Sequence, residues 1–191
     1  MFPIQANDQR RAPPKDLLRL LGKPYSDWVS KEYAGGWFAV LEYDLIPGCE
    51  HPSTKACWLS LLKRISLLHS EGYVHGDILP RNLVFSDDEG YIIDFDLTRQ
   101  EGQRYVLGYN HMDFGKYRHP EAKANEKMVK AHDIFALAMI GSEYFGVDEE
   151  EAVSSATVED LAEFFESSAP ELSLNVKPSD PLDASGSPYR D

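Results

Sequence analysis

The sequence is poor in cysteine, in long apolar runs and in positive charge. Its 191 residues include two cysteines, Cys49 and Cys57, which are too few for a disulfide framework or for a four-ligand zinc site. No apolar run reaches the roughly 18–20 residues that span a bilayer, and no apolar stretch of signal-peptide length opens the chain. These absences argue against export and against a membrane partner, and they favour a reducing intracellular compartment, cytoplasmic or nuclear.

The net charge of −13 is concentrated towards the carboxy-terminal end. Residues 142–191 hold 13 of the 32 acidic residues but only two of the 19 basic ones. The rest of the chain is nearly neutral, whereas nucleic-acid binding depends largely on the neutralisation of phosphate. The charge therefore argues against nucleic acid as a partner. The length and the hydrophobic content of 42% fit one globular domain with tails.

Apolar periodicity predicts a small set of elements. Residues 1–35 are expected to be a flexible lead, in which the stretch 16–32 holds one short helix. The elements predicted after the lead are a buried strand at 37–43, a core helix from Ser53 or Thr54 to Gly72, a hairpin with strands at 83–85 and 91–94, a buried helix at 131–145, one acidic helix at 148–166 and a disordered tail at 167–191. Together they predict an α+β fold that is mainly α-helical.

One segment concentrates the residues that carry chemistry. Asp77 and Asn82 lie five residues apart in the stretch HGDILPRN, and Asp94 and Asp96 follow at the end of a predicted strand. Carboxylate and amide oxygens that converge in this way are the ligands that hard cations favour. Taken singly, these residues would also fit turn and cap positions, because Asp and Asn readily bond to nearby backbone.

The order and spacing of these residues resemble the protein-kinase superfamily. HGDILPRN is similar to the kinase catalytic loop H-R-D-x-x-x-x-N, and IDFD is similar to the strand and D-F-G metal motif. The pair of motifs also resembles aminoglycoside-phosphotransferase-like enzymes and fungal kinase-like proteins, in which an acidic residue can replace the last glycine. The resemblance implies ATP and Mg²⁺ as cofactors, with Asp77 as the catalytic base and with Asn82 and Asp94 as Mg²⁺ ligands near the phosphates.

The resemblance assigns roles to further residues. Arg81 occupies the place of an arginine in tyrosine-kinase catalytic loops, where it would balance phosphate charge. Asp96 is expected to be a metal ligand or, as the alternative, a turn residue beside the site. WFAVLEYDLIPG resembles the fifth strand and hinge, so Glu42 and Asp44 would lie along the edge that meets adenine. His75 would anchor the catalytic loop.

Two matches lie further along the chain. HPE at 119–121 stands where A-P-E closes the activation segment, and Asp133 matches an aspartate that braces the catalytic loop from a buried helix. The letters D-F-G also occur at 113–115. They follow Asn82 by 31 residues and have no preceding strand, so we assign the metal motif to Asp94.

The chain also departs from a complete kinase. No glycine-rich loop and no V-A-I-K lysine precede the hinge, so the resemblance covers roughly residues 36–147. It implies a kinase-like carboxy-terminal lobe with most of the amino-terminal lobe missing. Gly76 replaces an arginine that meets activation-loop phosphates, Leu79 replaces the lysine of serine/threonine kinases, and Glu121 lacks its usual distant arginine, since Arg190 is the only arginine after Arg118.

These matches and departures leave more than one function open. The first is a phosphotransferase that transfers phosphate from ATP to a protein hydroxyl, with the rest of the upper lobe supplied by a short amino terminus, a partner chain or a longer gene product. The alternative is a catalytically inactive pseudokinase that serves as a scaffold for a protein partner. A carboxylate-metal hydrolase or glycosyl transferase built on Asp94 and Asp96 is a third class without further support.

Overall fold

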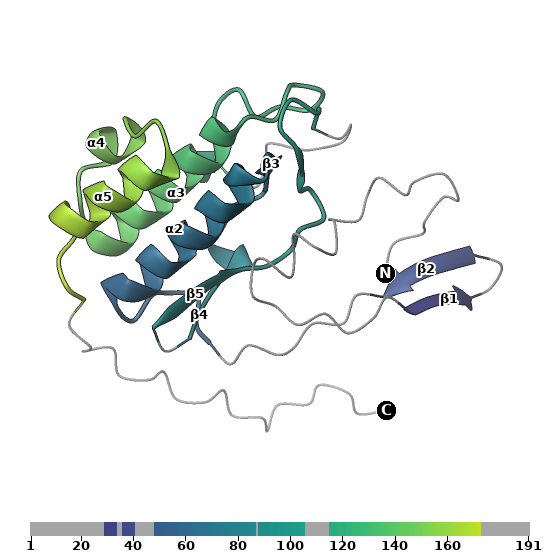
Figure 1. Ribbon diagram of the computed structural model, residues 1–191, viewed down its shortest axis with the longest axis horizontal. Coiled ribbons are helices and arrows are strands. Elements are labelled where there is room, and N and C mark those ends of the chain that lie inside the picture. Colours follow the sequence, from purple (N-terminus) through teal and green to yellow (C-terminus); the bar gives the residue numbers. More distant parts are fainter. Residues whose placement is uncertain (1–28, 34–35, 41–47, 87, 106–114, 173–191) are drawn as a thin grey trace, which may run out of the picture.

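The computed structural model describes residues 29–33, 36–40, 48–86, 88–105 and 115–172, and within them it is an α+β fold (Figure 1). The elements in chain order are β1 (Val29–Tyr33), β2 (Gly36–Val40), α2 (Lys55–Ser70), β3 (Tyr73–Val74), the 3-10 helix η1 (Pro80–Asn82), β4 (Leu83–Ser86), β5 (Glu89–Ile92), β6 (Arg99–Gln100), the 3-10 helix η2 (Gly115–Tyr117), α3 (Lys130–Phe145), α4 (Glu149–Val153) and α5 (Val158–Ser168). The described strands form three two-stranded antiparallel sheets: β1-β2, β3-β6 and β4-β5.

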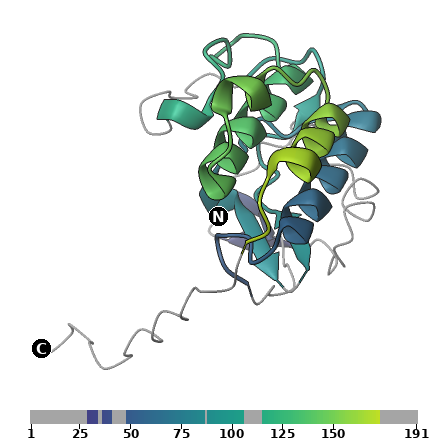
Figure 2. The ribbon, with the colours of Figure 1, turned by 90° about the vertical axis from the view of Figure 1, so that its left-hand side faces the viewer.

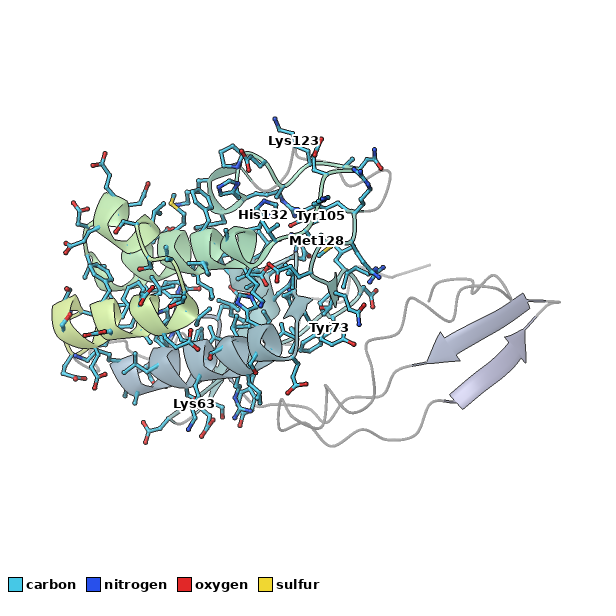
Figure 3. All side chains as sticks on the ribbon, turned by 45° about the horizontal axis from the view of Figure 1, so that its top comes forward. Lys63, Tyr73, Tyr105, Lys123, Met128 and His132 are labelled. Carbon is cyan, nitrogen blue, oxygen red and sulfur yellow. The ribbon has the colours of Figure 1, made fainter. Side chains whose placement is uncertain are left out.

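Helices α2, α3 and α5 lie side by side (Figures 1 and 2). Helix α2 begins after Thr54, whose hydroxyl accepts a hydrogen bond from the backbone N–H of Cys57 at 3.2 Å. It ends before Gly72, which adopts the left-handed φ of 80°. The predicted core helix is therefore confirmed. One face of α2 is buried, whereas Lys63 on the other face points into solvent (Figure 3).

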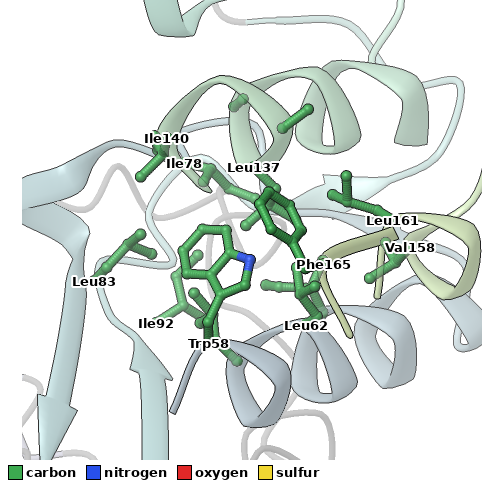
Figure 4. Close-up of a cluster of buried hydrophobic side chains, with 14 of the residues drawn as sticks. Trp58, Leu62, Ile78, Leu83, Ile92, Leu137, Ile140, Val158, Leu161 and Phe165 are labelled. Carbon is green, nitrogen blue, oxygen red and sulfur yellow. The ribbon is translucent and has the colours of Figure 1, made fainter. Parts of the chain in front are cut away.

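The core is centred on Trp58 of α2 (Figure 4). Its ring is fully buried and packs against Phe85 of β4 and Phe165 of α5, with ring centroids 6.2 and 5.7 Å away. Gly141 of α3 allows this approach, because a Cβ there would lie 2.7 Å from Cζ2 of Trp58 and would overlap the ring of Phe165. Helix α5 therefore closes the same core that α2, α3 and the hairpin share.

The hairpin β4-β5 carries the site residues at its open end. Leu83 pairs with Ile92 and Ser86 pairs with Glu89, so the strands lie close to the predicted positions. Leu83 and Phe85 alternate with half-buried neighbours, as expected for a sheet with one face on a core. The backbone N–H of Ile93 then donates to the carbonyl of Asn82 at 2.9 Å. The strand register therefore places Asn82, the last residue of HGDILPRN, beside Ile93, the first residue of IDFD.

Two predictions for the carboxy-terminal part are wrong. The single acidic helix at 148–166 is two helices, α4 and α5, because Thr157 starts a new helix. Its hydroxyl accepts from the N–H of Asp160, and the carboxylate of Asp160 accepts from the N–H of Thr157. This capping box starts α5 after α4 has ended at Val153. The disordered tail predicted from 167 begins too early, since α5 continues to Ser168 and Ala169 is buried. Residues 173–191 lie outside the described part.

The expectation for the amino-terminal part needs one correction. Residues 29–33 were expected within the flexible lead but form β1. This strand pairs with β2 in antiparallel register, so that Val29 lies opposite Val40 and Tyr33 lies opposite Gly36. The predicted strand at 37–43 appears as β2 over Gly36–Val40, whereas residues 41–43 lie outside the described residues. The predicted short helix, DLLRLL at 16–21, also lies outside them. Among the described helices, none has the length and apolar character required to cross a bilayer.

Candidate functional site

The loop between β3 and β4 is polar yet buried. His75 has no exposed surface, Asp77 is 9% exposed and Asn82 is 4% exposed. Buried polar groups are costly unless they are paired, so the loop must be satisfied from elsewhere in the fold. The partners come from α2, α3 and the segment that contains η2.

Asp133 of α3 holds the first half of this loop. Its carboxylate accepts hydrogen bonds from the backbone N–H groups of His75 at 2.7 Å and Gly76 at 2.9 Å, and it lies 2.9 Å from Nε2 of His69. Burial raises the pKa of Asp133, but the hydrogen bond from His69, the charges of both histidines and the Gly76 amide together hold it below its ordinary value. The predicted structural brace is confirmed.

His75 anchors the loop from inside. Its Nδ1 accepts a hydrogen bond from the N–H of Asp77 at 3.3 Å, and its ring packs edge-on against Phe95 at 5.1 Å. Burial lowers the pKa of His75, while the charges of Asp133, Asp77 and Asp94 act in the opposite direction. Neutral His75 is therefore the native form at pH 7. The carboxylates of both site motifs, Asp77 and Asp94, thus lie close enough to act on this imidazole.

We expect the free energy of unfolding to fall as the pH drops below 6.5. The unfolded chain gains a proton on His75 near its ordinary pKa of 6.5, whereas burial keeps the folded imidazole neutral. The stability is thus complete above 6.5 and is lost as the pH falls towards the folded-state pKa. His75→Asn, which can still accept the bond from Asp77, should flatten this slope in urea denaturation at pH 7 and 5. Exposed His51→Asn should keep it, and equal slopes in His75→Asn and wild type would contradict the assignment.

Asp77 is held by two groups from different parts of the chain. Its Oδ1 lies 2.8 Å from Nη2 of Arg118, and Nδ2 of Asn82 donates to its Oδ2 at 3.1 Å and to its carbonyl at 2.8 Å. Arg118, on the segment after η2, has 7% of its side chain exposed. Charge-assisted hydrogen bonds of this kind fix both position and orientation. The position and orientation of the Asp77 carboxylate are therefore fixed.

The cation nearest Asp77 differs from the one that sequence reasoning selected. Nη2 of Arg81 lies 3.9 Å from Asp77 and its side chain is 54% exposed, so this pair is weaker than the buried one. Arg118 was missed because it is 41 residues away along the chain. Its place directly before the HPE motif was the one available signal, since that segment returns to the catalytic loop.

Asn82 and Asp94 both lie at the open end of the hairpin, because Asn82 precedes β4 and Asp94 follows β5. Because Nδ2 of Asn82 donates to Asp77, its Oδ1 is the atom that could bind a cation. Asp94 is exposed and has a left-handed φ of 64°, a conformation that costs a residue other than glycine about 1–3 kcal/mol. Such a backbone is typical of functional sites, where it aims a side chain.

Asp96 adds a third carboxylate to this region. Its pKa is raised first by desolvation and then by the charge of Asp94, so the two carboxylates repel each other. Within the described residues, however, Asp77, Asp94 and Asp96 do not form a group close enough to share one ion unaided. A cation here would need the Asn82 amide or ligand phosphates to complete its shell. Glu42 and Asp44, predicted to meet adenine, lie outside the described residues.

A small pocket opens beside Asp77. Its lining joins the loop between β3 and β4 to η2, to the segment after η2 and to α3, and it includes Gly76, Asp77, Tyr117, Arg118 and His132.

Comparison with known proteins gives partial matches to kinases. No protein-family model matches the chain. A stretch of 94 residues, 48% of this chain, is 34% identical to the serine/threonine-protein kinase Kist of Rattus norvegicus, and the human protein of that name matches equally. A stretch of 78 residues, 40% of the chain, is 33% identical to the probable serine/threonine-protein kinase irlC of Dictyostelium discoideum.

The matches cover a small part of these relatives. The matched region spans 22% of the length of Kist and 5% of the length of irlC. The similarity therefore concerns one part of a kinase. Together with the motif order, it supports a protein-kinase-like relationship for this chain.

Proposed function

We propose that this chain is the carboxy-terminal, site-bearing part of a protein-kinase-like phosphotransferase that uses ATP and Mg²⁺ and phosphorylates a hydroxyl on a protein. The observation that carries the proposal is the buried catalytic loop, in which Asp133 fixes the backbone and Asp77 is oriented by Arg118 and Asn82. The partial similarity to serine/threonine kinases supports the same class of activity.

In this function Asp77 orients the acceptor hydroxyl and takes its proton. The residue needs a fixed direction more than a strong base, because phosphoryl transfer depends mainly on positioning and on charge stabilisation. The two hydrogen bonds to Asp77 give it that direction. The pocket beside it gives a hydroxyl side chain a way to approach.

The residues at the open end of the hairpin fit Mg²⁺. The amide oxygen of Asn82 and the exposed carboxylate of Asp94 are hard oxygen ligands, and the raised pKa of Asp96 indicates repulsion that a cation would relieve. Bound Mg²⁺ would neutralise charge on the phosphates. We assign Asn82 and Asp94 as the ligands and keep Asp96 as a third, weaker candidate.

Arg118 supplies the positive charge that the catalytic loop itself lacks. Leu79 stands where serine/threonine kinases carry a lysine, and it is 4% exposed and packed inward. Arg118 reaches the same carboxylate from the segment after η2. We propose that it balances charge beside Asp77, with exposed Arg81 as an outer contributor. Contacts to adenine through Glu42 and Asp44, and completion of the upper lobe by a partner or by further chain, remain part of the proposal.

Titration with ATP in the presence and absence of Mg²⁺ tests the proposal. We expect saturable binding that Mg²⁺ tightens, because the ion would join the phosphates to Asn82 and Asp94. Asp94→Asn should abolish the tightening, because it removes a ligand charge. Asp88→Asn, a matched change at the closed end of the same hairpin, should retain it. Binding is read by calorimetry or by quenching of tryptophan fluorescence.

Other outcomes would count against the proposal. If a folded chain shows no saturable binding at millimolar ATP, it does not bind nucleotide by itself. The ion pair between Arg118 and Asp77, already formed without a substrate, would then be a structural feature of an interaction scaffold. Mg²⁺-dependent binding that survives in Asp94→Asn would place the metal elsewhere.

A further inference from the structure

A second cluster of polar side chains adjoins the pocket beside Asp77, whose lining also includes His119 and His132. His119 and Glu121 follow η2, and His132 lies in the first turn of α3. One ligand atom from each lies within 4.8 Å of the other two. Over the described ranges from 48 to 172, this is the one group of three or more His, Cys, Asp or Glu side chains that come so close.

The environment of His132 leaves one ring nitrogen facing the cluster. The residue is 5% exposed, and its Nδ1 lies 3.0 Å from the hydroxyl of Tyr105 (Figure 3). Histidines that bind metals usually engage their second nitrogen in such a bond, which fixes the ring and its tautomer. Nε2 is then the atom that remains for a ligand bond.

The other two residues are held against His132 by local structure. The ring of His119 stacks on that of His132 with centroids 4.9 Å apart and an interplanar angle of 26°. Nδ1 of His119 accepts the backbone N–H of Glu121 at 3.2 Å, and coordination of a metal by this nitrogen would replace that hydrogen bond. The carbonyl of His119 accepts the N–H of Ala122 at 2.9 Å. A tight turn therefore presents His119 and Glu121 together to the helix.

The carboxylate of Glu121 is the third candidate ligand. Glu121 makes no ion pair with any other described residue, and the only arginine after Arg118 is Arg190 in the undescribed tail. Its carboxylate is thus exposed and lies beside the two imidazoles.

We infer that His119, Glu121 and His132 form a binding site for a divalent transition metal ion, with Zn²⁺ as the best fit. Two histidines and one carboxylate are a ligand set that Zn²⁺ takes, with a fourth position left for water or a further ligand. The site is separate from the Mg²⁺ site proposed at Asn82 and Asp94 and does not depend on it. Its chemistry differs too, because imidazole favours Zn²⁺ over Mg²⁺.

A metal at this position would join the segment after η2 to α3. Arg118 directly precedes His119 and contacts Asp77, so the ion would tether the residue that orients the loop carboxylate. The inference therefore goes beyond phosphotransfer to a metal clamp on the segment that completes the site. It applies equally to an enzyme and to a scaffold.

Calorimetric titration of the chelator-treated chain with ZnCl₂ tests the site. We expect one equivalent of Zn²⁺ to bind at micromolar concentration or tighter and to raise the midpoint of thermal unfolding. His119→Asn and Glu121→Gln, at partly or fully exposed positions, should each weaken binding by at least the about 10–100-fold that loss of a ligand's supporting partner costs. His119→Asn should also abolish the thermal shift.

The matched control is the double change Cys49→Ser with His51→Asn, which removes an exposed thiol and an exposed imidazole that lie outside the cluster. It should leave both readouts unchanged. Absence of binding by the folded wild-type chain would overturn the inference. Binding that survives in His119→Asn, or that disappears in the control, would also overturn it, because the ion would then be held elsewhere.

Discussion

Asp133→Ala should lower the free energy of unfolding by about 3–5 kcal/mol, the range for breaking a buried charged network by removing one partner. The change removes the carboxylate that accepts from the backbone of His75 and Gly76 and from the ring of His69. Alanine cannot accept any of these bonds, and water has no access because Asp133 is 1% exposed. Urea denaturation followed by tryptophan fluorescence measures the loss.

The control for this experiment is the removal of a carboxylate that does not bind the loop. Glu163→Ala removes an exposed carboxylate from α5, and surface changes of this kind usually stay within about 0.5 kcal/mol. If Asp133→Ala lost no more than this control, the brace would not stabilise the fold. The pKa of Asp133 is lowered in the folded state, which sets the pH dependence of its effect. Its contribution to the free energy of unfolding is present above pH 3.8 and is lost as the pH falls through the folded-state pKa.

Gly76→Arg should destabilise the chain by about 3 kcal/mol, although it restores the residue typical of kinases, because it combines backbone strain with overpacking. Gly76 has a φ of 77°, which disfavours any side chain. A Cβ there would overlap Cε of Met128 and would come within 3.3 Å of Cε1 of Tyr105. Both neighbours are buried in a small cluster of their own.

Gly72→Arg is the matched control for this change. Its φ of 80° imposes nearly the same backbone cost, but a Cβ there would meet no atom within 4 Å. The difference between the two variants in denaturation midpoint therefore isolates the clash, and we expect it to be at least about 1 kcal/mol. Equal losses would show that Met128 and Tyr105 can move aside. The space of the usual arginine would then be open in this fold.

The predictions from sequence succeeded where a single segment carries the signal. The buried face of α2 and the strands of the hairpin repeat with clear periods, so both elements were placed well. The break before Thr157 was missed because apolar spacing continues across it, while the capping box depends on a side-chain bond that spacing does not reveal. Strand β1 was missed because its sequence, VSKEY, has no apolar alternation.

The sequence predicted the residues of the loop and one of their partners, Asp133, but not Arg118. Asp77, Asn82 and Asp133 were found through the order of their motifs along the chain. Arg118 could not be selected, because the ion pair depends on how the segment after η2 folds back over the loop. The same holds for the histidine pair, whose members are 13 residues apart and meet only in the tertiary structure.

The packing of α5 on α2 connects α5 to the loop between β3 and β4, although α5 does not belong to the site. Phe165 seats against Trp58 at one end of α2, and His69 at the other end of that helix holds Asp133 and, through it, the loop. A protease that cuts between α4 and α5 would therefore do more than trim a terminus. Loss of α5 would open the core beneath α2 and would weaken the hold of His69 on Asp133 and on the loop.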